Sequence, residues 1–235
     1  MTYAEHLIPS RLVCCTWEQS TDAPHEQRVV PDGCVDLIWS EERLTIAGPD
    51  RRVRLVALKS GMRLVGARLR PGVAGAALGL PASELCDEAP DATDVLGRDT
   101  ADALLAAIVA GGDPHAILLR AVEARVRAGR DPDPLVRAAI AALDRPQARV
   151  AAVAADLGVS ARHLQRRISD AVGYGPKTLQ RVLRFRRLQA LAPAPLAELA
   201  LDAGYADQAH MTAEVTRLAG IPPVRFLKDR IPTTA

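Results

Sequence analysis

The sequence predicts an α+β protein, in which a mainly antiparallel β region with short helices precedes an all-α carboxy-terminal region. Three observations carry this prediction. Apolar and polar residues alternate within residues 1–70, as they do in half-buried strands. From residue 71 onwards, the apolar residues recur with helical spacing. Within residues 148–228 a pattern of helix, turn and helix occurs twice, which predicts two helix-turn-helix motifs joined by a linker helix.

Short runs bounded by turn signals predict the strands of the first 70 residues. Val35, Leu37 and Trp39 alternate on one face of a run that follows the Pro-Asp-Gly turn signal of residues 31–33. Such alternation favours antiparallel strands with one face towards water. We expect a loop at residues 21–27 and strands at residues 11–17, 34–39, 44–47, 53–59 and 63–70.

The helical part that follows leads into a domain boundary. Helices are predicted at residues 73–80, 99–110 and 114–127. The segment of residues 128–134 contains two prolines and one glycine and has little to bury, so it is the best boundary. We therefore predict two domains, residues 1–130 and residues 131–235. Hydrophobic residues make up 49% of the chain, which is ample for two cores.

The two helix pairs of the carboxy-terminal domain repeat each other. Before the turn the copies align with an offset of 46 residues, and after it with an offset of 47, which pairs Ser160 with Asp207 as helix N-caps. An ordinary helical bundle is the alternative, but it does not account for the agreement of caps, turns and closing prolines. The matching apolar stripes are Val150, Val153 and Ala154 in the first copy and Leu196, Leu199 and Ala200 in the second.

These motifs resemble the DNA-binding domain of AraC-type transcription regulators over residues 148–228. The resemblance is carried by the Leu-Gly-Val-Ser of residues 157–160, the Gly-Tyr-Gly-Pro-Lys of residues 173–177 and, most specifically, residues 199–210. It implies a sequence-specific regulator that binds double-stranded DNA. Its two recognition helices would enter the major groove about one helical turn apart.

The amino-terminal domain carries a second resemblance. Val-Pro-Asp-Gly-Cys-Val-Asp-Leu-Ile-Trp at residues 30–39 and Leu-Arg-Pro-Gly at residues 69–72 are similar to a domain of undefined ligand that precedes AraC-type domains in some bacterial regulators. The resemblance spans about residues 5–125. By analogy with other regulators of this class, it implies a cupin-like domain that senses a small-molecule effector, dimerises, or does both. RNA polymerase and a second copy of the chain are the further partners that it suggests.

The first recognition helix offers the strongest candidates for base contacts. Arg162, Gln165 and Arg166 share one face at helical spacing. Arg can donate two hydrogen bonds to guanine, and Gln can pair with the edge of adenine. In the second helix, Gln208 and Thr212 occupy the base-facing positions that the resemblance implies. Small and acidic neighbours in the second helix predict that the first helix provides most of the specificity.

Cations of the first recognition helix and the linker helix are the candidates for phosphate contacts, which position a protein on DNA without reading its sequence. Two or three of them can face phosphate at once. They are Arg167, Lys177, Arg181, Arg184, Arg186 and Arg187.

The charge of the chain agrees with this assignment. Residues 1–130 hold 15 Lys and Arg against 18 Asp and Glu, a balance of −3, whereas residues 131–235 hold 15 against 10, a balance of +5. A basic surface that coincides with the helix-turn-helix motifs is what DNA binding requires. The sequence contains no apolar run long enough to span a membrane and no secretory signal, so we expect a cytoplasmic protein.

Chemistry of other kinds finds little support in the sequence. Cys14, Cys15, Cys34 and Cys86 lack the spacing of a metal site or a disulfide framework, and we expect no catalytic residues, no metal and no cofactor. Two alternatives remain open. The chain could be a DNA-linked enzyme or repair sensor that uses cysteine chemistry in its amino-terminal domain. It could also be an interaction module whose helix pairs bind protein.

Overall fold

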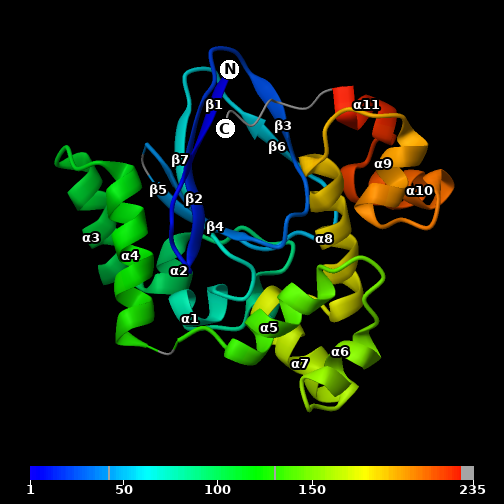
Figure 1. Cartoon of the computed structure of the whole chain (residues 1–235). Coiled ribbons are helices and arrows are strands. Elements are labelled where there is room, and N and C mark those ends of the chain that lie inside the picture. The colour runs from blue at the N-terminus through cyan, green and yellow to red at the C-terminus, as the bar shows by residue number, and fades with distance from the viewer. Residues whose placement is uncertain (42, 130, 229–235) are drawn as a thin grey trace.

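The computed structural model describes residues 1–41, 43–129 and 131–228, which divide into a β-rich amino-terminal part and a helical carboxy-terminal part (Figure 1). The strands of the amino-terminal part are β1 (Thr2–Leu7), β2 (Val13–Ser20), β3 (His25–Val29), β4 (Val35–Ser40), β5 (Arg43–Ala47), β6 (Arg54–Leu58) and β7 (Arg63–Leu69). The antiparallel β fold and the helical domain that follows it are therefore confirmed.

The strands form two antiparallel sheets. One has the order β1-β2-β7-β4-β5, and the other pairs β3 with β6. Strand β7 lies between β2 and β4, so that Leu69 faces Val13 on one side and Val35 on the other. A side chain at Gly66 of β7 would overlap the Trp17 indole on β2, and glycine there lets the ring lie against the sheet. The alternation predicted for β4 is confirmed, because Val35, Leu37 and Trp39 are buried.

Two strands were not predicted. Strand β3 lies partly in the segment expected to be a loop, and β1 occupies the amino terminus. Most side chains of both strands are exposed or only half-buried, so neither strand carries the apolar alternation from which strands are predicted. Both are held by backbone pairing, β1 with β2 and β3 with β6.

Helices pack on the larger sheet. Helix α4 packs on β2 and β7, while α2 and α3 pack on β5. Asp113 caps α4 by accepting hydrogen bonds from the backbone N–H groups of His115 and Ala116. These elements are α1 (Ala74–Leu78), the 3₁₀ helix η1 (Ala82–Leu85), α2 (Ala92–Leu96), α3 (Arg98–Val109) and α4 (Pro114–Ala128).

The carboxy-terminal part is built on the long helix α8, which spans two separate cores (Figure 1). Leu179 and Val182 of α8 belong to the first core, and Phe185 and Leu188 belong to the second. The helices are α5 (Pro134–Leu143), α6 (Val150–Asp156), α7 (Ala161–Val172), α8 (Pro176–Ala190), α9 (Leu196–Ala203), α10 (Gln208–Ala219) and α11 (Pro223–Lys228). None of the helices in the described segments has the length and apolar character of a membrane span.

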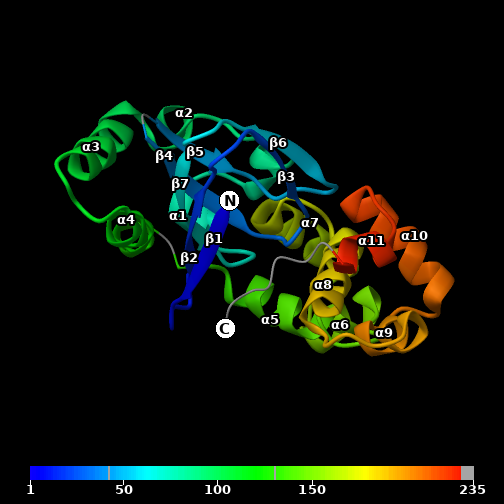
Figure 2. The same cartoon turned by 90° about the horizontal axis from the view of Figure 1, so that it is seen from above.

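The two parts of the chain pack against each other at both ends of α8. Helix α7 contacts α1 and η1, and Gly173 at its end lies so close to Pro49 that an added Cβ would approach that ring to 2.5 Å. Near the other end, Arg28 of β3 donates a 2.7 Å hydrogen bond to the carbonyl of Ala219 in α10. Figure 2 shows β3 and β6 on the side of the amino-terminal part that faces α10 and α11.

Candidate nucleic-acid interface

The first helix-turn-helix unit consists of α6 and α7. The turn between them contains Gly158, whose φ of +69° is a left-handed conformation that glycine adopts without strain. Ser160 caps α7, because its hydroxyl accepts a 3.1 Å hydrogen bond from the backbone N–H of His163. Leu164 and Ile168 are fully buried and fix which face of α7 points outwards. The unit thus forms as the sequence predicts.

The second unit repeats the first with the same local geometry. Helix α10 has 12 residues, like α7, and begins after Asp207, whose carboxylate accepts a 2.7 Å hydrogen bond from the backbone N–H of His210. Both helices end at a glycine in the left-handed conformation, Gly173 and Gly220. The predicted role of Asp207 as an N-cap is confirmed.

The outward face of α7 presents the residues predicted to contact bases. Arg162, Gln165 and Arg166 are exposed. Gln165 donates a 3.3 Å hydrogen bond to the hydroxyl of Ser169 one turn along the helix. Within the described residues neither arginine forms a salt bridge, so both guanidinium groups keep their five donors for a ligand.

The outward face of α10 differs in shape and charge. Gln208 is exposed, and Thr212 donates its hydroxyl proton to the carbonyl of Gln208 over 2.8 Å. With Ala209, Ala213 and Thr216, these side chains line a shallow depression on the helix. Such small side chains allow close approach, and the alanine and threonine methyl groups suit contact with a thymine methyl.

Most of the predicted phosphate-binding cations have partners inside the protein. Arg167 forms a salt bridge of 2.5 Å with Asp133, the N-cap residue of α5. Arg187 donates to the carbonyls of Ala203 and Asp144 and pairs with the carboxylate of Asp144 at 2.9 Å. These bonds tie α8 to α9 and to the end of α5.

Glu214 holds α10, the second predicted recognition helix, against α8. Its carboxylate lies 3.4 Å from Arg181, 3.8 Å from Arg184 and 3.4 Å from the Nε2 atom of His210, and only 14% of its side chain is exposed. Glu214 is the acidic neighbour expected on the second helix, and the structure directs its carboxylate towards the linker helix α8. Sequence reasoning missed this cluster, although His210 and Glu214 stand one helical turn apart. We call Arg181, Arg184, His210 and Glu214 the Glu214 cluster.

Lys177 points to solvent, whereas His210 and Arg186 are half-buried. Lys177, near the start of α8, is exposed, and it forms no salt bridge to any residue that the structure describes. His210 packs edge-on against Tyr205, with ring centroids 5.5 Å apart, and accepts a hydrogen bond from the backbone N–H of Ala206. His210 therefore packs locally, within the second unit. Arg186 is half-buried between α8 and the amino-terminal part, where Asp32 and Cys34 lie near it.

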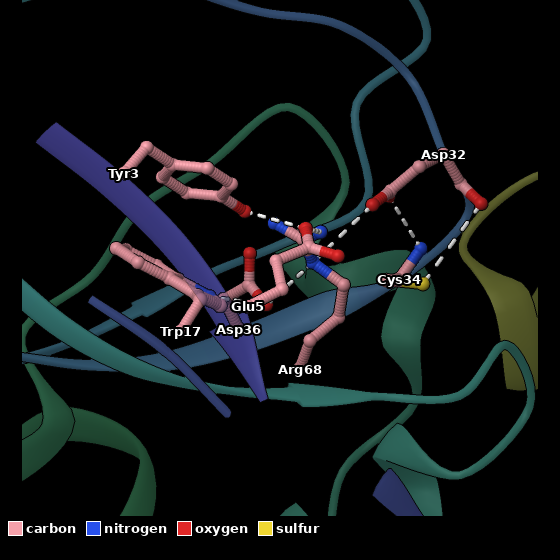
Figure 3. A network of polar contacts seen from close by, with 7 residues as sticks. All are labelled: Tyr3, Glu5, Trp17, Asp32, Cys34, Asp36 and Arg68. Carbon is pink, nitrogen blue, oxygen red and sulfur yellow. Dashed lines mark hydrogen bonds and ion pairs between the residues drawn. The ribbon is translucent and has the colours of Figure 1, made fainter. Parts of the chain in front are cut away.

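A second polar cluster lies in the amino-terminal part, around Arg68 (Figure 3). The guanidinium of Arg68 lies 3.0 Å from Glu5, 3.2 Å from Asp36 and 3.5 Å from Asp32. Tyr3 donates a 2.6 Å hydrogen bond to Glu5. Burial raises the pKa of Asp36, and the nearby Arg68 opposes this shift. Asp36 and Arg68 thus form a hydrogen-bonded ion pair inside this cluster.

Comparison with known proteins places both parts of the chain. Residues 153–229 match the model of a helix-turn-helix domain, and residues 6–91 match the model of a domain of unknown function, DUF6597. No curated protein matches the chain in sequence.

The chain is similar to several solved structures, with low sequence identity and TM-scores below 0.5. The C-terminal domain of AraT, a response regulator from Geobacillus stearothermophilus, is 23% identical, with 44% of this chain and 93% of that chain covered and a TM-score of 0.40. ToxT from Vibrio cholerae O395 is 11% identical, with 96% and 97% covered and a TM-score of 0.45. A ToxT structure bound to (E)-4-(8-methylnaphthalen-1-yl)but-3-enoic acid is 10% identical, with 97% and 99% covered and a TM-score of 0.49.

The matched helix-turn-helix model and the two repeated helix-turn-helix units define the class of protein. The chain is a DNA-binding transcription regulator. The two helix-turn-helix units on one linker helix agree with the arrangement expected for residues 148–228, and the matched helix-turn-helix model covers residues 153–229. The match to a domain of unknown function leaves the finer resemblance of residues 5–125 a prediction, and the domain limits of 1–130 and 131–235 stay predictions as well.

Proposed function

We propose that the protein reads a two-part operator in the major groove, one half with α7 and the other with α10. Arg162, Gln165 and Arg166 would contact the bases of the first half, and Gln208 and Thr212 those of the second. The observation that carries this proposal is the repetition of one capped, solvent-facing recognition helix at each end of α8. An ordinary helical bundle does not require the same cap, turn and exposed face to occur together twice.

Phosphate contacts would come chiefly from Lys177 and from those N–H groups of the paired arginines that their carboxylate partners leave free. Lys177 is exposed. Arg181, Arg184 and Arg187 are half-buried and paired, and Arg167 is exposed but held by Asp133. A paired arginine still has donors that its carboxylate partner does not use. The pairing therefore lowers the expected contribution of each arginine to the salt dependence of binding.

We further propose that the amino-terminal part regulates how the readers meet DNA and performs no catalysis. Both helix-turn-helix units contact it, α7 through α1 and η1 and α10 through Arg28. An effector, a second copy of the chain or RNA polymerase could bias this arrangement by binding one orientation better than another. DNA as the partner supports a cytoplasmic location.

The test is selection of bound duplexes from a randomised library with the full chain, Gln165→Ala and Gln208→Ala. Each variant should relax one half of a two-part motif, at a cost of about 1–3 kcal/mol in discrimination. Arg120→Ala is the control, because this exposed arginine of α4 changes the charge without touching either reader. A motif that stays unchanged in both glutamine variants would refute the assignment of the readers. Absence of any motif, together with shallow salt dependence, would favour the protein-binding alternative.

A further inference from the structure

Three side chains with metal-binding atoms meet where the edge of the larger sheet contacts α4. His6 comes from β1, Glu18 from β2 and His115 from the first turn of α4. In the antiparallel pairing of β1 with β2, Ala4 faces Glu18 and His6 faces Thr16, which places His6 and Glu18 on the same face as diagonal neighbours. The ligand atoms of the three residues all lie within 4.8 Å of one another.

The two imidazole rings are arranged so that both can serve one ion. Their centroids are 5.1 Å apart and their planes cross at 86°. Nε2 of His115 lies 3.9 Å from the carboxylate of Glu18, and Nδ1 of His115 is buried without a hydrogen-bond partner. In the described part of the chain, neither ring nitrogen of His115 makes a hydrogen bond. Its polar neighbours are the Glu18 carboxylate and the His6 ring, the other two members of the cluster.

We propose that His6, Glu18 and His115 bind a divalent transition-metal ion of the zinc class, with the fourth position open to water. Two imidazole nitrogens and one carboxylate oxygen form a ligand set that zinc uses in open sites. Tetrahedral coordination at zinc bond lengths separates ligand atoms by about 3.3 Å. His6 is exposed and Glu18 is half-buried, so the proposal requires their side chains to rotate towards His115 by about the difference between the present separation, up to 4.8 Å, and this value.

Arg63 sets the affinity of this site. Its guanidinium lies 3.2 Å from the same carboxylate oxygen of Glu18 that faces His115. Carboxylates that bind metals commonly accept a hydrogen bond from a neighbouring group, which fixes their orientation. The positive charge also opposes a cation. We therefore expect Arg63→Gln, which keeps a donor and removes the charge, to bind the metal more tightly than the natural chain.

An ion at this place would join the exposed edge strand to the helix that covers the sheet. The effect would extend along α4, whose Arg125 donates to the carbonyls of Ala77 and Leu78 at the end of α1. Helix α1 in turn contacts the first reader, α7. The proposed site at the start of α4 is therefore connected, through α4 and α1, to one of the two contacts that hold the DNA-binding units.

The experiment is titration of the chelator-treated full chain with Zn²⁺, followed by calorimetry and by metal analysis after dialysis. One ion per chain is expected. His6→Ala and Glu18→Gln should each weaken binding about tenfold or more. His25→Ala is the matched control, because His25 is an exposed histidine of β3 outside the cluster, and it should bind as the natural chain does.

Titration with Co²⁺ separates this site from the cysteines. The expected visible spectrum is that of a four-coordinate nitrogen and oxygen site without a thiolate charge-transfer band. Circular dichroism of each variant checks the fold, and exposed His6 can be replaced without loss of a core contact. The proposal is overturned if the chain binds no Zn²⁺ stoichiometrically, or if His6→Ala and Glu18→Gln bind as the natural chain does. It is equally overturned by a thiolate band that disappears in Cys14→Ser.

Discussion

Replacement of Glu214 by Gln tests how the second reader is attached to α8. The change removes one negative charge and keeps the size of the side chain. In the natural chain this acid neutralises Arg181 and Arg184, both within 3.8 Å of its carboxylate. Without that charge, both guanidinium groups become free to bind phosphate. Loss of the partly buried cluster should also lower the free energy of unfolding by about 1 kcal/mol.

The effect on DNA binding can be worked out from counterion release. Each additional phosphate contact steepens the plot of log K against log salt by about 0.9. Two released arginines would steepen it by about 1.8, so that affinity would fall by a further factor of about 12 between 50 and 200 mM salt. At low salt, Glu214→Gln should therefore bind duplex DNA more tightly than the natural chain and discriminate less between sequences.

The assay is fluorescence anisotropy with a selected duplex and a scrambled duplex over a series of salt concentrations. Glu198→Gln serves as the matched control, because Glu198 is exposed on the neighbouring helix α9 and has no salt bridge within the described residues. That variant changes the net charge by the same amount without freeing an arginine. If both variants give the same salt slope, Arg181 and Arg184 do not reach phosphate and the reasoning is wrong.

Three further predictions follow from single contacts. Cys14 should react with iodoacetamide about tenfold faster at pH 8 than at pH 6. The reason is that a hydrogen bond from Cys34 lowers the pKa of Cys14 to about 7, so its reactive thiolate forms as the pH rises through that value. A reaction rate that keeps increasing above pH 9 would contradict this prediction. Asp207→Ala should lower the free energy of unfolding by about 1 kcal/mol in urea denaturation, through loss of the N-cap of α10, and an unchanged midpoint would show that the cap is dispensable. Gly66→Ala should destabilise the larger sheet by roughly 2 kcal/mol, or about 4–8 °C in Tm, because the added Cβ displaces the Trp17 indole. A Tm equal to that of the natural chain would mean that the ring moves aside at no cost.

Local signals in the sequence were enough to predict the helix-turn-helix units. Caps such as Ser160 and Asp207 and turn glycines such as Gly158 act within a few residues, so the sequence records them directly. Strands β1 and β3 escaped prediction because partner strands hold them through backbone bonds rather than through an apolar face. Helix α2, a single short turn capped by Asp91, was also missed.

Long-range contacts were beyond the reach of the sequence patterns. His6, Glu18 and His115 come from three different elements, and their proximity depends on the pairing of β1 with β2 and on the packing of α4 over the sheet. The orientation of Glu214 depends in the same way on how α10 lies against α8. In each case the residue types were visible in the sequence, whereas the partners follow only from the fold.

The contacts between the two parts of the chain explain how the amino-terminal part can affect both readers at once. The readers stand on one rigid helix, and their separation must match about one turn of DNA, roughly 34 Å, for both to bind. The first reader is held by η1 and α1, and the second by Arg28 of β3. Strand β3 leads into the turn at residues 31–34, and an added Cβ at Gly33 of this turn would lie 3.3 Å from the hydroxyl of Tyr174, which follows α7. A shift of that turn would therefore move the contact at Arg28 relative to the contact at α7. A ligand or partner that binds near this turn could therefore change the spacing of the readers without touching DNA.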